Sequence, residues 1–255
     1  MALLPSTANP FGGRIIDHVE LDPSWDREIF ARMLRESIDA WTADRVKVVW
    51  LQLSPEQVEL VPPAIQAGFV YHHATEGWVQ LTKTLVEGSY IPPFATHYIG
   101  AGGVVIDDYR RLLVIQERHH TRPHLKLPGG ALHPGEHIAD AVMREVKEET
   151  GIETRFVSLV CFRHWHGYRY HKSDIYFVTR LEPLSLEIVP DPSEIAMCRW
   201  MNIDEYLLSE HTHAFNRRIV RAALDAERGR GELVPDVIEG YGSRETHEIF
   251  MPGGR

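Results

Sequence analysis

One short segment of the sequence concentrates carboxylates at a spacing that suits metal binding. Glu145, Glu148 and Glu149 lie at positions i, i+3 and i+4, so they share one face of a helix. An acidic cluster of this kind usually faces solvent. Here Ile138 and Val142, which belong to the apolar stripe of the same helix, precede Glu145 and Glu149 by two helical turns. The spacing therefore predicts that these two carboxylates point inward or into a cleft.

Carboxylates that converge in a cleft require a positive partner. They repel one another, and their removal from water is costly. Oxygen ligands at this density suit a hard divalent cation, which would be Mg²⁺ or, as the alternative, Mn²⁺. Arg144 can reach Glu148 or Glu136 and hold a carboxylate in place. The residues thus predict a cation site on one face of this helix.

Residues 130–152 resemble a known sequence motif, the Nudix box. Its pattern is G-x5-E-x7-R-E-U-x-E-E-x-G-U, where U is a bulky aliphatic residue. Every defined position is matched, by Gly130, Glu136, Arg144, Glu145, Val146, Glu148, Glu149, Gly151 and Ile152. At average residue frequencies, a chance match anywhere in this chain is on the order of one in ten million. The segment is therefore identified as a Nudix motif.

This resemblance implies a Mg²⁺-dependent pyrophosphohydrolase. It implies that Glu145, Glu148 and Glu149 are catalytic metal ligands, joined by the backbone carbonyl of Gly130 or of the adjacent Gly129. With the charge of the diphosphate neutralised, a Glu-activated water attacks one phosphorus. The expected products are a nucleoside monophosphate and a phosphorylated remainder.

The resemblance also implies catalytic roles for residues beyond these ligands. Arg144, together with Glu136, would support the carboxylates around the cation. A glutamate in the loop before a strand that ends in Trp often acts as a base or as an extra ligand. Glu194, six residues before Trp200, has that place in this chain. An ordinary surface glutamate is the equal alternative for Glu194.

Substrates of the two-domain Nudix group that this chain resembles include ADP-ribose, NADH and other dinucleotides, with CoA-type compounds in some members. Arg163, His166 and Tyr168 follow the box, where the arginine could pair with phosphate and a ring could stack on a base. Lys126, just before the box, is a further candidate for substrate binding. An ordinary half-exposed hairpin explains the cluster after the box equally well. The alternative function is a nucleotide-binding sensor with little hydrolysis, which predicts damaged carboxylates, whereas all of them are intact.

Hydrophobic periodicity predicts an α/β domain around these residues, over residues 93–231. The resemblance implies a Nudix α/β/α sandwich with a mixed sheet. Expected helices cover residues 138–150, with Gly151 as the C-terminal cap, and residues 216–228. Expected strands cover residues 97–107, 111–117, 153–163, 169–181 and 196–201. Residues 232–255 form a Gly-rich, polar tail.

Residues 1–92 predict a smaller α/β domain. One helix is expected to begin at Asp22-Pro23, and a second, over residues 56–67, to be kinked or broken at Pro62-Pro63. Expected strands cover residues 14–20, 47–53, 69–74 and 78–85, and a Pro-containing linker follows.

Motifs in both parts of the chain resemble a two-domain Nudix group. The resemblance rests on residues 50–53, 68–74, 172–177 and 199–201. It implies that the first domain has a truncated acetyltransferase-like (GNAT-type) fold. The pyrophosphate loop R/Q-x-x-G-x-G/A of acetyltransferases is missing from residues 1–92. We therefore expect a structural or dimerising role rather than acetyl transfer.

Composition disfavours several other classes of protein. The chain has 255 residues and a net charge of −9, whereas a nucleic-acid-binding surface needs clustered Lys and Arg. No run of about 18 apolar residues predicts a membrane span, and no signal-peptide pattern opens the chain, so a cytoplasmic enzyme is expected. Cys161 and Cys198 are expected to be buried free thiols. Histidine pairs such as His72-His73 have no Cys partners at zinc-site spacing, so surface or substrate-side positions are expected for them rather than a zinc site.

Overall fold

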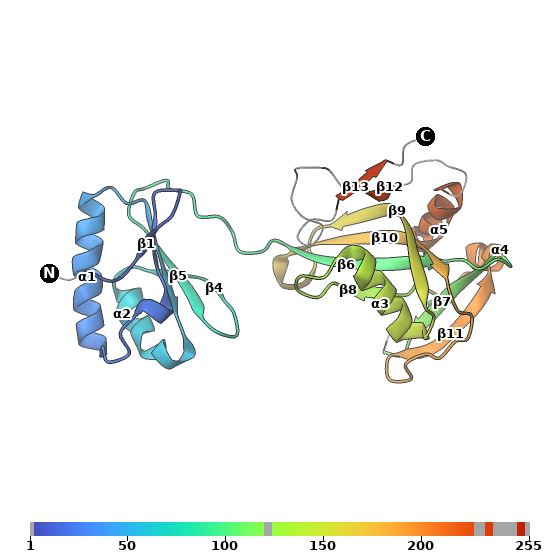
Figure 1. The fold of residues 1–255 in the computed structure, drawn as a ribbon, viewed down its shortest axis with the longest axis horizontal. Coiled ribbons are helices and arrows are strands. Elements are labelled where there is room, and N and C mark those ends of the chain that lie inside the picture. The colour runs from blue at the N-terminus through green and yellow to red at the C-terminus, as the bar shows by residue number, and fades with distance from the viewer. Residues whose placement is uncertain (1–2, 120–123, 227–232, 237–248, 253–255) are drawn as a thin grey trace. The chain divides into compact units, whose positions relative to one another are not determined.

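The computed structural model describes residues 3–119, 124–226, 233–236 and 249–252. The chain divides into two compact units, Met1–Ala95 and Thr96–Arg255 (Figure 1). Most of the expected tail over residues 232–255 and His120 of a histidine pair lie outside the described residues. No helix in the described part of the chain is long and apolar enough to cross a membrane.

The first unit is built around a mixed sheet. Its strands run in the order β1 (Thr7–Ala8), β2 (Arg14–Ile16), β3 (Val48–Leu53), β5 (Val79–Thr84) and β4 (Val70–Ala74). β2 and β3 are parallel, and the other neighbours are antiparallel. Helix α1 (Arg27–Ala43) buries Phe30, Leu34 and Trp41 in one core with Val49 and Leu51 of β3. The amphipathic pattern of this helix is thereby confirmed.

Helix α1 begins later than the Asp22-Pro23 pair predicts. The carboxylate of Asp26 accepts hydrogen bonds from the backbone N–H groups of Glu28 and Ile29, at 2.9 and 2.8 Å. Asp22 instead accepts from the backbone N–H of Ser24, in a turn before the helix. Both aspartates have a side chain that can cap a helix N-terminus. Which of them begins α1 therefore depends on which residues pack their apolar face against the sheet.

The helix that contains Pro62-Pro63 is broken, as the prolines predict. A 3-10 segment, η2 (Pro55–Leu60), precedes α2 (Val61–Gln66), and both prolines lie in the first turn of α2. A proline is tolerated there because the N–H groups of a first turn have no helical partner. The strand expected over residues 14–20 is shorter than predicted, because η1 (His18–Glu20) follows Ile16.

The second unit contains the sheet that carries the motif. Its strands run in the order β13 (Ile249–Pro252), β12 (Leu233–Asp236), β9 (Thr154–Trp165), β10 (Ser173–Pro183), β6 (His97–Val105) and β8 (Gly129–Ala131). β6 and β10 are parallel, and the other neighbours are antiparallel. A separate antiparallel pair joins β11 (Ile195–Asn202) to β7 (Arg111–Glu117). The expectation of a mixed sheet is confirmed.

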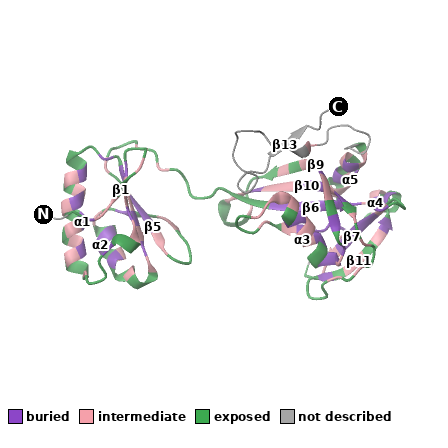
Figure 2. Ribbon diagram, in the orientation of Figure 1, coloured by how far each residue is buried: buried purple, intermediate pink, exposed green. Residues whose placement is uncertain are grey.

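Helices α3 (Ile138–Thr150) and α5 (Ala214–Ala226) cover opposite faces of this sheet. On β6, Val105 packs with Val142 and Val146 of α3, whereas its neighbour Val104 belongs to a core with Ile219 of α5. Successive residues of a strand point to opposite faces. The buried positions accordingly run along the strands between the two helices (Figure 2).

The boundaries of several elements in this unit differ from expectation. Helix α3 and its cap are confirmed, since Gly151 has φ +77° and donates its N–H to the carbonyl of Lys147. Strand β10 begins only at Ser173, because Arg169–His171 forms the 3-10 turn η3, in which Tyr170 has a positive φ of 52°. Helix α4 (Ile203–Leu208) is missing from the expected elements, since its six residues are too few to show a period. The expected last residues 227–228 of α5 lie outside the described residues.

The two cysteines are less buried than expected, and one histidine pair is partly enclosed by aromatic rings. Cys161 and Cys198 are free thiols, as predicted, but both are half-buried. His72 and His73 are also half-buried and approach through their Nδ1 atoms at 2.6 Å, and the ring of His73 stacks on Phe94.

Candidate active site

Helix α3 presents two carboxylates inward, as the spacing predicts. The side chain of Glu149 is 8% exposed and that of Glu145 is 17% exposed, whereas Glu148 is 59% exposed. Glu145 and Glu149 flank the apolar residues Val142 and Val146, which pack on the sheet. The carboxylates therefore lie at the edge of the core rather than on a solvated helix face.

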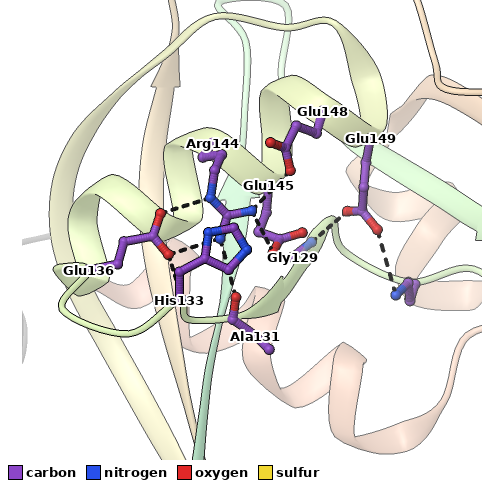
Figure 3. A network of polar contacts seen from close by, with 9 residues as sticks. Gly129, Ala131, His133, Glu136, Arg144, Glu145, Glu148 and Glu149 are labelled. Atoms are coloured by element: carbon purple, nitrogen blue, oxygen red, sulfur yellow. Dashed lines mark hydrogen bonds and ion pairs between the residues drawn. The ribbon is translucent and has the colours of Figure 1, made fainter. Parts of the chain in front are cut away.

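Arg144 donates hydrogen bonds to three carboxylates of the motif (Figure 3). Its Nε and Nη2 donate to the two oxygens of Glu136 at 2.7 and 2.9 Å, which makes a bidentate pair. Its Nη1 donates to Glu145 and Glu148, at 2.9 Å in each case. Nη2 also donates to the carbonyl of Ala131 at 3.2 Å. One guanidinium thus links the loop before α3, the helix itself and strand β8.

The bidentate pair has a clear electrostatic consequence. Hydrogen bonds from Arg144 lower the pKa of the Glu136 carboxyl to about 2, against the opposing effect of its partial burial. Glu136 therefore stays ionised over the whole physiological range, and the pair acts as a permanent charged clamp.

Glu149 lies beside this network, with partners of its own. Its Oε2 accepts the backbone N–H of Gly129 at 2.7 Å, and Lys126 Nζ lies 4.0 Å from its Oε1. Burial raises the pKa of the Glu149 carboxyl to about 7, and the charges of Glu145 and Glu117 act in the same direction, although Lys126 and the Gly129 N–H oppose them. A buried carboxyl with this pKa gains most from a cation that stabilises its ionised form.

Glycines in β8 allow the backbone to approach these carboxylates closely. A Cβ atom at Gly130 would lie 2.6 Å from the carboxyl carbon of Glu145. A Cβ atom at Gly129 would lie 2.3 Å from the carbonyl oxygen of Ala101, and Gly129 has a φ of +147°. Gly129 therefore requires glycine for both space and backbone conformation, whereas a side chain at Gly130 would displace the Glu145 carboxylate.

Gly130→Ala is expected to displace the Glu145 carboxylate and to lower cation-dependent turnover roughly ten- to a hundredfold. The fold should persist, because the atom that must move is the end of a flexible side chain. Steady-state turnover and the thermal midpoint measure the two effects. Gly77→Ala is the matched control, since nothing lies within 4 Å of its added Cβ. Equal turnover in the two variants would contradict a role for the close approach at Gly130.

The donor set fits a hard divalent cation. Arg144 Nη1 lies 2.9 Å from an oxygen of Glu145 and from one of Glu148, so two carboxylates already converge on a positive centre. All candidate ligands, including the Gly130 carbonyl, are oxygens, as Mg²⁺ and Mn²⁺ prefer. Within the described residues, no three His, Cys, Asp or Glu side chains are grouped so that they could hold a metal ion. The chemistry of the donor set nevertheless fits such a cation, and the Arg144 network already draws two of the carboxylates together.

Of the predicted substrate-binding residues, the structure brings two to this site. Lys126 and Arg163 line a cavity of about 260 Å³ that reaches Gly129, and Tyr176 lines it as well. Lys126 also forms an ion pair with Glu117 at the end of β7. Sequence reasoning missed Glu117 and Tyr176, because no spacing relates them to the motif. An acidic residue at the end of a buried strand was the available signal for Glu117.

His166 and Tyr168 do not line this cavity. His166 contacts the hydroxyl of Ser173 at 2.9 Å through Nδ1, and the Tyr168 ring packs against Tyr98 at 5.5 Å. Strand alternation separates Arg163 from its neighbour His164, whose ring packs near His166. The side chain of Glu194 is exposed, and its neighbour Ile195 pairs with Glu117 across β11 and β7.

The metal-free protein is expected to lose stability as Glu149 ionises. The ordinary pKa of its carboxyl is 4.5 and the folded value is about 7, so between them the folded state binds more protons. The free energy of unfolding then falls as the pH rises through this window, by on the order of 1–3 kcal/mol. Denaturant unfolding in EDTA at several pH values measures this slope. Glu149→Gln should reduce it, and identical slopes in both proteins would refute the assignment.

Comparison with known proteins decides the family. Residues 96–223 match the family model described as NUDIX domain, and residues 4–85 match one described as Nudix hydrolase domain. The chain belongs to the Nudix hydrolase family. The match over residues 96–223 includes the motif, helix α3 and strands β6 to β11, so the Nudix fold of the second unit is shown.

Several Nudix relatives are similar over most of this chain. Nudix hydrolase 8 of Arabidopsis thaliana is 42% identical over 81% of this chain and 57% of its own length. Nudix hydrolase 2 of the same plant is 37% identical over 80% of this chain and 74% of its own length. Nucleoside diphosphate-linked moiety X motif 6 of Homo sapiens is 34% identical, over 90% of this chain and 74% of its own length. The chain thus spans just over half the length of the first relative and about three quarters of the other two.

Proposed function

We propose that this Nudix chain is a cation-dependent pyrophosphohydrolase that splits a nucleoside diphosphate linked to another moiety. ADP-ribose, NADH or a related dinucleotide is the proposed substrate class. The observation that carries the proposal is the burial of Glu149 against Gly129, within a motif whose Glu145 and Glu148 lie on the same helix. Burial of this carboxylate costs stability, and groups with a raised pKa in a cleft are typical of functional sites.

Each residue of the site has a defined task in the proposed reaction. Glu145, Glu148 and Glu149, with the Gly130 carbonyl, would hold Mg²⁺ or Mn²⁺, which supplies charge neutralisation for the diphosphate and activation of the attacking water. Arg144 holds the loop against α3, so that the carboxylates keep their places. This clamp prearranges the site before the substrate binds.

Cations of the chain itself would orient the substrate. Lys126 and Arg163 line the cavity that reaches Gly129, and an ammonium and a guanidinium there can pair with the oxygens of a diphosphate. Glu117 holds Lys126 next to Glu149, so it acts as a positioning residue. Glu194 stays a candidate base, because its neighbour Ile195 pairs with Glu117, which holds Lys126.

We propose a structural or dimerising role for the first unit, whose fold we relate to a truncated acetyltransferase. Its mixed sheet and its covering helix α1 are compatible with that relation. At the edge strand β4, Val70 and Tyr71 are exposed, as an association surface requires. Light scattering of the full chain measures whether a homodimer forms, and a monomer at all concentrations would leave only the structural role.

The decisive experiment is a substrate panel. The full chain is incubated with ADP-ribose, NADH and CoA in the presence of Mg²⁺, Mn²⁺ or EDTA, and the products are separated by chromatography. We expect a nucleoside monophosphate and a phosphorylated remainder with a divalent cation, and none in EDTA. Nucleotide binding without turnover in either cation would replace the proposal by the alternative, a nucleotide-binding sensor.

A further inference from the structure

A groove on the first unit collects three arginines. It lies between α1 and α2, which pack side by side (Figure 1), and it has a volume of about 460 Å³. Arg27, Arg32 and Arg35 of α1 line it together with Pro63 and Gln66 of α2. All three arginines are exposed, so a molecule from solution can reach them. The volume lies in the range of small-molecule sites, which is roughly 300–1,000 Å³.

The spacing along α1 explains why the arginines meet at one groove. Arg27, Ala31 and Arg35 follow one another at intervals of a single turn, so they form a row along the helix. Ala31 also lines the groove, and its short side chain leaves room between the two guanidiniums. Arg32 lies three residues before Arg35, which places it on the neighbouring row. One helix therefore presents three cationic side chains to the same space.

The protein does not neutralise these arginines itself. Glu28 and Glu36 each lie one helical turn from Arg32, at the spacing that favours an ion pair. Even so, none of the three guanidiniums forms an ion pair or a hydrogen bond with another side chain in the part of the chain that the structure describes. Asp and Glu outnumber Lys and Arg in residues 1–95, so a groove with an excess of cations is an exception on this unit. The unused cations point to an anionic ligand.

We propose that this groove binds a small molecule that carries a diphosphate group. A guanidinium offers pairs of N–H donors that match the oxygens of a phosphate, and three guanidiniums can hold two adjacent phosphates. The amide of Gln66 can donate as well. Glu28 also lines the groove, but its single negative charge leaves an excess of positive charge there. Asp26 already accepts two N–H groups in the first turn of α1, so the arginines, and not the helix N-terminus, hold the anion.

The test uses two ligands with the same diphosphate group. Binding of inorganic pyrophosphate and of ADP is measured by calorimetry in EDTA, on the full chain with Lys126→Ala, so that the cavity at Gly129 loses its ammonium. We expect one pyrophosphate per chain, with a Kd below roughly 1 mM. Arg32→Gln and Arg35→Gln should each weaken binding about three- to tenfold, and the two together about ten- to a hundredfold. Binding of ADP without binding of pyrophosphate would contradict recognition of the diphosphate.

Two variants separate an effect of charge from damage to the unit. Arg45→Gln changes an exposed arginine beyond the end of α1 and outside the groove, so it should leave the affinity unchanged. Glu28→Gln removes the negative charge from the groove and should tighten pyrophosphate binding about two- to fivefold. Thermal midpoints should stay the same, because the substituted side chains are exposed and glutamine is a good helix former. With Lys126 intact, the groove variants should change turnover less than about twofold, since the motif belongs to the other unit.

Two further results would overturn the diphosphate groove. One is a Lys126→Ala chain that binds neither ligand at roughly 5 mM. The other is a folded double variant, Arg32→Gln with Arg35→Gln, whose affinity for pyrophosphate is unchanged. A failure of the proposed hydrolase function looks different. In that case the unmodified chain turns over no substrate with either cation, even though its binding of pyrophosphate still depends on Arg32 and Arg35.

Discussion

Glu149→Gln is expected to lower cation-dependent turnover by about a hundred- to ten-thousandfold while the chain remains folded. Glutamine has the same shape, and its carbonyl oxygen can still accept the Gly129 N–H that binds Glu149 at 2.7 Å. It has no negative charge, so it is a poor ligand for a hard cation. Steady-state rates in Mg²⁺ and in Mn²⁺ measure the loss.

The same substitution should leave stability equal or raise it near neutral pH. Burial makes the ionised Glu149 unfavourable in the metal-free protein, and the variant removes that cost. Glu153→Gln is the matched control, because Glu153 is an exposed carboxylate that pairs with Lys147 beyond the end of α3. Loss of rate together with unchanged or increased stability identifies a functional carboxylate. Undiminished turnover by the glutamine variant would contradict the proposed function.

Arg144→Ala is expected to destabilise the fold by about 1–3 kcal/mol and to lower turnover about ten- to a hundredfold. The variant removes a bidentate bond to Glu136 and single bonds to Glu145 and Glu148 at once. The side chain of Glu136 is only 15% exposed, so the loss of Arg144 would leave its charged carboxylate without a partner in a poorly solvated position. Denaturant unfolding and steady-state kinetics give the two effects separately.

Two further variants show whether the clamp is responsible. Arg155→Ala breaks an exposed pair with Glu182, and it should change stability by less than about 1 kcal/mol. In the double variant Arg144→Ala with Glu136→Gln, part of the lost stability should return, because the unpaired carboxylate is gone. Additive effects of the two substitutions would contradict the clamp.

Sequence periodicity was sufficient wherever the relevant neighbours are local. The positions of Glu145 and Glu149 relative to the apolar stripe of α3 predict their burial, since a helix has a fixed period. The cap at Gly151 and the break at Pro62-Pro63 follow from backbone restrictions on single residues. Where two residues with equal local chemistry compete, as Asp22 and Asp26 do for the start of α1, the sequence leaves the choice open.

The sequence by itself therefore determined the motif, the phase of its helix and the oxygen-rich donor set of this Nudix protein. Only the tertiary structure decided what surrounds them. Lys126 and Glu117 meet Glu149, and Arg163 meets Phe215, across long sequence separations. Such contacts depend on strand pairing and on which face of a strand each residue occupies, and a shift of one residue reverses that face. For that reason the contacts of Lys126, Glu117 and Arg163 emerge only from packing, whereas the spacing of Glu145, Glu148 and Glu149 already predicts a cation site.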